Sequence, residues 1–177
     1  MAFLQVLRNF LVPVAAREVS VTRPAPPTEY SVMPLTEKDL DEVLRLNLRC
    51  FENGENYTKH TFSYLLSQAN ALCYQAAVKD GGMAAFLCVL VGKDGTAHIT
   101  TIGVAPEHRR RRLAERLLKH LEQALTEIHV GSVVLEVRVS NIAAQSLYKA
   151  LGFTVVQRLA GYYNDGEDAL LMIKAII

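Results

Sequence analysis

Residues 98–118 constrain the fold most, because they change from one kind of secondary structure to another within a few positions. Ile99, Ile102 and Val104 are typical of a buried strand, and Pro106 would end it. A stripe of leucines then recurs every four residues, as in an amphipathic helix, at Leu113, Leu117, Leu121 and Leu125. The sequence therefore predicts a strand that turns directly into a helix.

Four consecutive arginines precede the leucine stripe, namely Arg109, Arg110, Arg111 and Arg112. The first turn of a helix has unpaired backbone N–H groups and a partial positive charge, and arginine adds bidentate contacts to phosphate. A helix start that follows a strand end is accordingly a typical pyrophosphate site. A charge run alone would also fit a solvated surface, but its place at the turn favours anion binding.

Length and charge limit the classes of function. The 177 residues suffice for one domain with a sizeable core, since half of them are hydrophobic. A net charge of +1 argues against a nucleic-acid partner, which usually requires a strongly basic domain. No apolar run approaches the ~18 to 20 residues of a membrane span, so no membrane partner is expected.

The three cysteines, Cys50, Cys73 and Cys88, are odd in number and have no C-x-x-C spacing. They indicate neither a disulfide framework nor a zinc site, and we expect no metal. This use of cysteine is typical of a reducing compartment, which predicts a cytoplasmic protein.

Residues 1–28 are predicted to form an appendage to a domain that spans residues 29–177. A proline-rich linker occupies residues 21–28. Apolar side chains before it share one helical face and predict a short amphipathic helix that packs on the domain or on a partner; they are Phe3, Leu4, Leu7, Phe10 and Leu11. We expect a monomer or a homodimer.

The remaining pattern predicts a strand, two helices, three strands, a helix, a strand, a helix and two strands. Thr36 is a candidate cap of the first helix, and a second helix is expected from about Thr58 to Gln68. The turn residues between them predict that residues 71–79 and 83–91 form a β-hairpin. The later strands are expected at 133–139, 153–158 and 169–173, with a helix that begins at Ser140 or Asn141.

Two residues after the central helix are candidates for chemistry. Glu136 lies on an otherwise apolar strand and shares a face with Arg138, so it is either a general base or an ion-pair partner of an arginine. Tyr148 follows Asn141 by seven residues, on the same helical face. A phenol with a pKa of ~10 is protonated at neutral pH and can donate a proton to a thiolate, although a lone tyrosine is more often a core residue.

The turn at the arginines resembles the acyl-CoA signature of the GNAT superfamily of N-acetyltransferases: Gln or Arg, two residues, Gly, any residue, then Gly or Ala. Arg109 takes the first place and Ala114 the last, but Arg112 stands where the family has glycine. We expect Arg112 to point its side chain outward and to adopt a helix-start conformation that any L-residue can adopt. The resemblance implies an α/β (α+β) fold with a mixed, mostly antiparallel seven-stranded sheet and about four helices.

Residues 140–153 look like the second signature block of the same family, in which the tyrosine is the general acid and the asparagine helps to hold the pantetheine arm. The resemblance assigns these roles to Tyr148 and Asn141. It implies acetyl-CoA as cosubstrate, bound by Ile102, Val104, Arg109, Arg110, Arg111, Arg112, Leu113, Ala114, Asn141 and Tyr148.

Residues 135–138 and 161–172 are similar to the RimI-type ribosomal-protein-alanine N-acetyltransferases. In that family the glutamate of Leu-Glu-Val-Arg is the general base, which here is Glu136. In that family two loops frame the incoming peptide. The resemblance therefore implies that four residues contact the substrate, namely Phe51, Tyr57, Tyr162 and Tyr163. The implied reaction is direct acetyl transfer to the N-terminal α-amine of a protein or peptide, with a ribosomal protein among the candidates.

Two alternatives stay open: acetylation of a small-molecule amine on the same scaffold, and a catalytically silent acyl-CoA-binding module. His98, on the central strand, is a candidate auxiliary base, and we favour a packed or hydrogen-bonded strand histidine.

Overall fold

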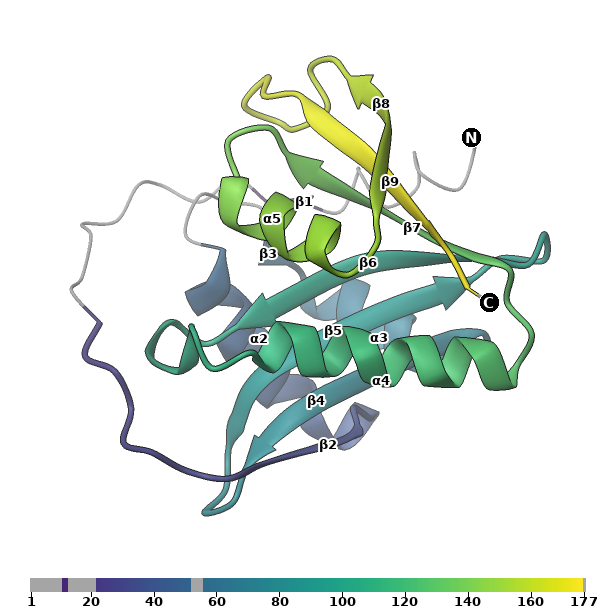
Figure 1. Cartoon of the computed structure of the whole chain (residues 1–177). Helices are drawn as coiled ribbons and strands as arrows, with labels where there is room; N and C mark the ends of the chain where they lie inside the picture. The colour runs from purple at the N-terminus through teal and green to yellow at the C-terminus, as the bar shows by residue number, and fades with distance from the viewer. Residues whose placement is uncertain (1–10, 13–21, 52–55, 177) are drawn as a thin grey trace.

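A seven-stranded sheet forms the centre of the computed structural model, which describes residues 11–12, 22–51 and 56–176 (Figure 1). The strand order is β2-β4-β5-β6-β7-β9-β8, and every neighbouring pair is antiparallel except β6 and β7. This arrangement confirms the predicted mixed, mostly antiparallel sheet. The strands are β2 Tyr30–Pro34, β4 Ala71–Val78, β5 Met83–Val91, β6 Thr96–Val104, β7 Ser132–Arg138, β8 Thr154–Leu159 and β9 Ala169–Ala175.

Helices cover both faces of the sheet (Figure 1). Helices α4 (Leu113–Glu127) and α5 (Ile142–Ala150) lie on one face, and α2 (Leu40–Cys50) and α3 (Lys59–Ser67) lie on the other. The predicted leucine stripe of α4 is buried against the sheet. Burial of each such leucine side chain contributes about 1.5–3 kcal/mol to the free energy of unfolding. None of the helices in the described part of the chain is long and apolar enough to cross a membrane.

Polar residues begin the helices near the predicted positions, but the predicted cap Thr36 precedes a 3-10 turn, and Asp39 is the residue that precedes α2. Asp39 accepts hydrogen bonds from the backbone and hydroxyl of Thr36, in a 3-10 turn (Glu37–Asp39) that leads into α2. Thr58 caps α3, and Asn141 caps α5 by accepting a hydrogen bond from the backbone of Ala144. These caps satisfy N–H groups that have no partner inside the helix.

The sheet opens between β6 and β7. These parallel strands pair only over the first three residues of each, the last pair being His98 and Val134. Beyond that pair they diverge (Figure 1). On β6, Thr100 is an extra residue in the pairing with β5, and such a bulge bends a strand and increases its twist. From Ile99 onward, the β7 side of β6 therefore has no strand partner among the described residues.

A short two-stranded ribbon was not predicted. Leu11–Val12 form strand β1, which pairs antiparallel with β3, Asn56–Tyr57. The predicted N-terminal helix is therefore wrong at Leu11, and its other apolar positions lie outside the described residues. Two-residue strands carry no recognisable periodicity, because their pairing depends on backbone contacts distant in sequence.

The fold leaves no room for a side chain at Gly103 on β6. A Cβ atom there would lie 2.6 Å from Cε1 of Phe86 and 3.0 Å from Sγ of Cys50. Because Phe86 is fully buried and cannot move aside, Gly103→Ala should lower the free energy of unfolding by about 1–3 kcal/mol, measured by urea denaturation. Gly131→Ala is the control, since a Cβ there meets nothing within 4 Å. Equal losses in both variants would contradict the steric argument.

Candidate active site

The loop between β6 and α4 has an unusual backbone conformation. Arg112, the residue that precedes α4, has φ 58° and ψ 23°, and Arg110 has φ 63°. This left-handed region costs a residue other than glycine on the order of 1–3 kcal/mol. The expectation that Arg112 adopts an ordinary helix-start conformation is therefore wrong, because the loop keeps the backbone shape that glycine favours. The side chain of Arg112 does point outward, with 83% of it exposed.

The start of α4 is a cluster of hydrogen-bond donors. No side chain in the described part of the chain caps this helix, and the N–H groups of its first turn, including those of Leu113 and Ala114, have no partner within it. Around them lie the exposed side chains of Arg109, Arg110 and Arg112. The arrangement suits a pyrophosphate.

Arg111 differs from its neighbours. Its guanidinium donates hydrogen bonds to the carbonyl oxygens of Ala25 and Pro26 and to the hydroxyl of Tyr30. Arg111 was predicted to bind acetyl-CoA with the other arginines, but its side chain contacts the N-terminal linker.

Ile102 and Val104 lie on β6 beyond the last pair with β7, so they border the opening in the sheet. Ile102 and Val104 pack against a core cluster that also contains Tyr148 of α5. Tyr148 is 6% exposed, and its ring lies 5.7 Å from that of Phe153. Burial raises the pKa of Tyr148 to about 12. The phenol is therefore protonated at neutral pH, as a proton donor requires.

Glu136 is paired with a histidine and not with an arginine. Nε2 of His98 lies 2.7 Å from Oε2 of Glu136, and the two side chains are only 10% and 7% exposed. Carboxylate oxygens accept hydrogen bonds, which assigns Nε2 of His98 as the donor. The preferred interpretation of His98 as a hydrogen-bonded strand residue is confirmed, and its partner is the candidate base. The predicted alternative, an ion pair of Glu136 with Arg138, is not formed.

Each member of this pair keeps one further polar atom unused. Among the described residues, Oε1 of Glu136 and Nδ1 of His98 are buried and have no hydrogen-bond partner. Buried polar atoms in proteins are nearly always satisfied by protein, water or ligand. The pair can therefore receive a water molecule or an amine at these two atoms.

The two candidate catalytic residues lie on opposite faces of the sheet. Val133, Leu135 and Val137 belong to the core cluster that includes Tyr148. Because successive residues of a strand point to opposite faces, Glu136 points to the face covered by α2 and α3. A proton donor and a proton acceptor thus lie on either side of the sheet, near the opening between β6 and β7.

The β8–β9 loop is held against β7 by Arg138. The guanidinium lies 4.0 Å from the ring centroid of Tyr163 and forms ion pairs with Asp165, at 3.0 Å, and with Glu167. The ring of Tyr162 packs on that of Tyr163 at 5.1 Å. This role of Arg138 was not predicted; the acids that follow the two tyrosines were the available signal.

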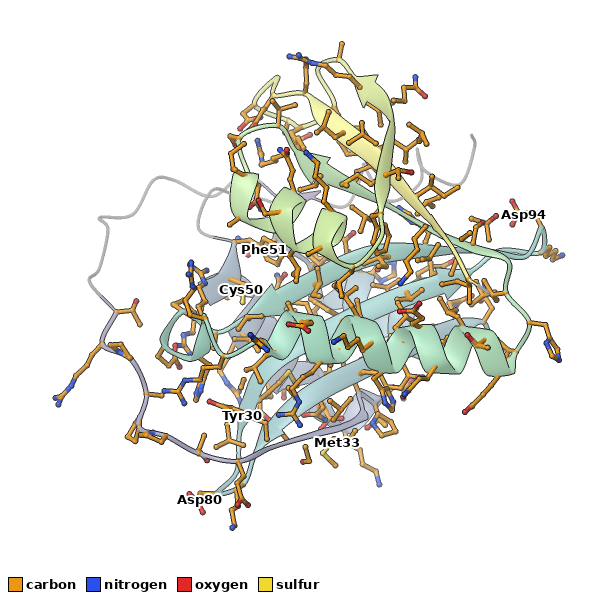
Figure 2. The ribbon with its side chains drawn as sticks, viewed as in Figure 1. Tyr30, Met33, Cys50, Phe51, Asp80 and Asp94 are labelled. Atoms are coloured by element: carbon orange, nitrogen blue, oxygen red, sulfur yellow. The ribbon has the colours of Figure 1, made fainter. Side chains whose placement is uncertain are left out.

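Phe51 and Tyr57 flank residues 52–55, which lie outside the described residues. Figure 2 shows Phe51 directly after Cys50, at the end of α2. The hydroxyl of Tyr57 donates a 2.8 Å hydrogen bond to the carbonyl of Thr100, the bulge residue. Phe51 and Tyr57 pack in the core cluster on the α2/α3 face, which is the face of Glu136 and Arg138.

In the parts of the chain that the structure describes, His, Cys, Asp and Glu form no group of three or more that could hold a metal ion.

Known proteins resemble this chain in sequence and in fold. The chain matches the model of the acetyltransferase (GNAT) family over residues 40–153. It is 33% identical over 159 residues to an N-alpha-acetyltransferase of Sulfurisphaera tokodaii, covering 81% of this chain and 92% of the relative. It is 34% identical over 146 residues to a putative [ribosomal protein bS18]-alanine N-acetyltransferase of Bacillus subtilis, covering 82% and 95%.

Among solved structures, the ribosomal-protein-S18-alanine N-acetyltransferase of Escherichia coli matches with a TM-score of 0.77 and 32% identity, over 84% of this chain and 94% of that one. The sheet, the open strand pair and these matches lead to one conclusion. This chain belongs to the GNAT family of acetyltransferases and is an N-acetyltransferase.

Proposed function

We propose that the enzyme transfers the acetyl group of acetyl-CoA to the free α-amine at the N-terminus of a protein or peptide. The observation that carries this proposal is the buried pair of Glu136 and His98, which keeps two polar atoms for an acceptor and its water. It lies on the face where the aromatic residues Phe51 and Tyr57 and the loop held by Arg138 lie. The relatives named for protein N-termini support the same acceptor class.

Acetyl-CoA fits the donors at the start of α4. The first-turn N–H groups, with Arg109, Arg110 and Arg112, would bind its pyrophosphate. The opening between β6 and β7 would receive its pantetheine arm beside Ile102, Val104 and Asn141. Backbone N–H groups on this side of β6 would then stabilise the negative charge that develops on the thioester oxygen.

The positions of Glu136 and Tyr148 on opposite faces of the sheet suggest how protons would be transferred. The α-amine has a pKa of ~8, so a modest fraction is already neutral at pH 7, whereas a lysine amine at ~10.4 is much harder to deprotonate. Glu136, held by His98, accepts the proton of the attacking amine through a water. As the new N–C bond forms and the C–S bond breaks, Tyr148 donates its proton to the departing sulfur.

A small-molecule amine is the main alternative acceptor. A polyamine pocket would need carboxylates that face the substrate, but both Asp165 and Glu167 are ion-paired with Arg138. The silent-module alternative is disfavoured by the presence of both Glu136 and Tyr148. A ribosomal protein as the natural substrate, a cytoplasmic location and a monomeric or dimeric state stay predictions.

The test is CoA release by purified enzyme with acetyl-CoA and a panel of acceptors. The panel holds short peptides with free or blocked N-termini, spermidine, and an N-blocked peptide that contains lysine. We expect turnover only with free α-amines, at rates that depend on the first residue. Turnover with spermidine alone would establish the small-amine alternative, and binding of acetyl-CoA without any turnover would establish the silent module.

Arg138→Met should raise KM for the peptide about tenfold or more while KM for acetyl-CoA changes little. The substitution keeps an apolar stem but removes the cation that holds Asp165, Glu167 and the ring of Tyr163, so the loop loses its fixed position. Steady-state kinetics with each substrate varied in turn measure both constants.

Arg158→Met is the matched control, because Arg158 forms an ion pair of 2.7 Å with Asp168 of the same loop but is 66% exposed. An exposed pair of this kind contributes little, so its peptide KM should stay near that of the wild type. A rise in both KM values in Arg138→Met would contradict a role specific to the peptide loop.

A further inference from the structure

The N-terminal linker is packed across the β6–α4 loop. We call residues 22–30 the strap; it runs along the side of the molecule where that loop lies (Figure 1). The backbone N–H of Ala25 donates a 2.9 Å hydrogen bond to the carbonyl of Glu107. In return, the guanidinium of Arg111 donates to the carbonyls of Ala25 and Pro26. A segment predicted to be only a spacer therefore forms reciprocal hydrogen bonds with the loop.

Tyr30 completes these contacts at the point where the strap enters β2 (Figure 2). Its hydroxyl accepts a 2.6 Å hydrogen bond from Arg111 and lies 2.8 Å from Nδ1 of His108. Its ring packs edge-on against that of His108 at 5.7 Å, and its carbonyl accepts a 2.8 Å hydrogen bond from Arg116 of α4. One tyrosine thus contacts both the loop and the first turns of the helix.

The residue held by the strap lies between the two strained ones. Arg110 and Arg112 both have positive φ, and Arg111, which joins them, is the residue whose side chain the strap binds. A left-handed conformation in a residue with a Cβ persists only where surrounding contacts hold it. The strap supplies such contacts at the centre of the strained segment.

We propose that the strap, through Arg111 and Tyr30, holds the acyl-CoA loop in its left-handed conformation and so sets the affinity for the cosubstrate. Arg111 is then a positioning residue, and tertiary contacts maintain at Arg112 a conformation that glycine adopts without support. This inference rests on the proposed use of acetyl-CoA. It gives the N-terminal segment a role in the site and explains how an arginine is accommodated where the family signature has glycine.

Tyr30→Phe is the first test, because it removes only the hydroxyl that bonds Arg111 and His108 and lies outside the groups assigned to CoA binding. Calorimetric titration with CoA should show Kd raised roughly tenfold, as the loss of about two hydrogen bonds implies. Arg23→Ala is the control: it removes a cation from an exposed position of the same strap and should leave Kd unchanged.

A background variant separates positioning from the loss of an arginine side chain. In Arg112→Gly, adding Tyr30→Phe should raise Kd much less than it does in the wild type, because glycine keeps the left-handed conformation without the strap. A Kd that is unchanged in Tyr30→Phe, or a rise that is equally large in the wild type and in Arg112→Gly, would overturn the proposal.

Hydrogen exchange of the amides of residues 109–114, measured without ligand, distinguishes this inference from the proposed function. Exchange should be faster in Tyr30→Phe than in the wild type and in Arg23→Ala. If the wild type bound no CoA while exchange still rose, the proposed cosubstrate would be wrong and the strap's hold on the loop would stand. Unchanged exchange would overturn that hold.

Discussion

Replacing Tyr148 with phenylalanine is expected to lower kcat on the order of 10²-fold, while Kd for CoA stays near the wild-type value. The substitution removes one hydroxyl and keeps the buried ring, including its packing on Phe153. Only the proton donated to the departing sulfur is lost. Steady-state kinetics give kcat, and calorimetric titration gives the affinity.

The pH dependence of the wild type adds a check on this role. Burial raises the pKa of Tyr148 to about 12, above its ordinary value of 10.0, so the protonated form persists as pH rises through the neutral and mildly alkaline range. At pH values below about 11, deprotonation of Tyr148 should therefore cause no fall in kcat. Tyr64→Phe, at a tyrosine that is 43% exposed, is the control for removing a phenol elsewhere. Full activity in Tyr148→Phe would exclude the acid role.

Glu136→Gln is expected to lower kcat by on the order of 10²- to 10³-fold and to flatten the rise of the rate with pH. Glutamine has nearly the same shape and still accepts the hydrogen bond from His98, but it cannot accept a proton. The variant then depends on amines that are already neutral. Rates measured from pH 6 to 9 with one peptide would show the change.

Glu122→Gln is the matched control, because Glu122 is paired with Lys174 in an ion pair of 2.6 Å and extends from α4, on the other face of the sheet. Its pH profile should match that of the wild type. If Glu136→Gln also kept the wild-type profile, the base would lie elsewhere, and His98 would be the first residue to substitute.

The positions of the helices were predictable from the sequence. The leucine stripe of α4 and the helix starts near Thr58 and Asn141 are local patterns, and the structure places each where the pattern indicated. The pairing of Glu136 with His98 was not predicted. It depends on the parallel register of β6 and β7, in which His98 lies beside Val134, and sequence periodicity does not define register between strands 38 positions apart.

The other features that were not predicted share one physical cause: contacts between residues distant in sequence outweigh local conformational preference. Arginine disfavours positive φ, yet Arg112 adopts it in a loop whose centre the strap binds. Arg138 reaches its acids across the β8–β9 loop, and the linker contacts Arg111 over more than eighty residues of sequence. Propensity and pattern describe neighbours along the chain, so they predict none of these contacts.

The proposed function requires that the acceptor be an N-terminal α-amine. Its most direct test is tandem mass spectrometry of a single short peptide that carries both a free N-terminus and an internal lysine, after incubation with the enzyme and acetyl-CoA. We expect the acetyl group on the α-amine, because that amine is partly neutral at pH 7. Acetylation of the lysine side chain, with the N-terminus left free, would contradict it.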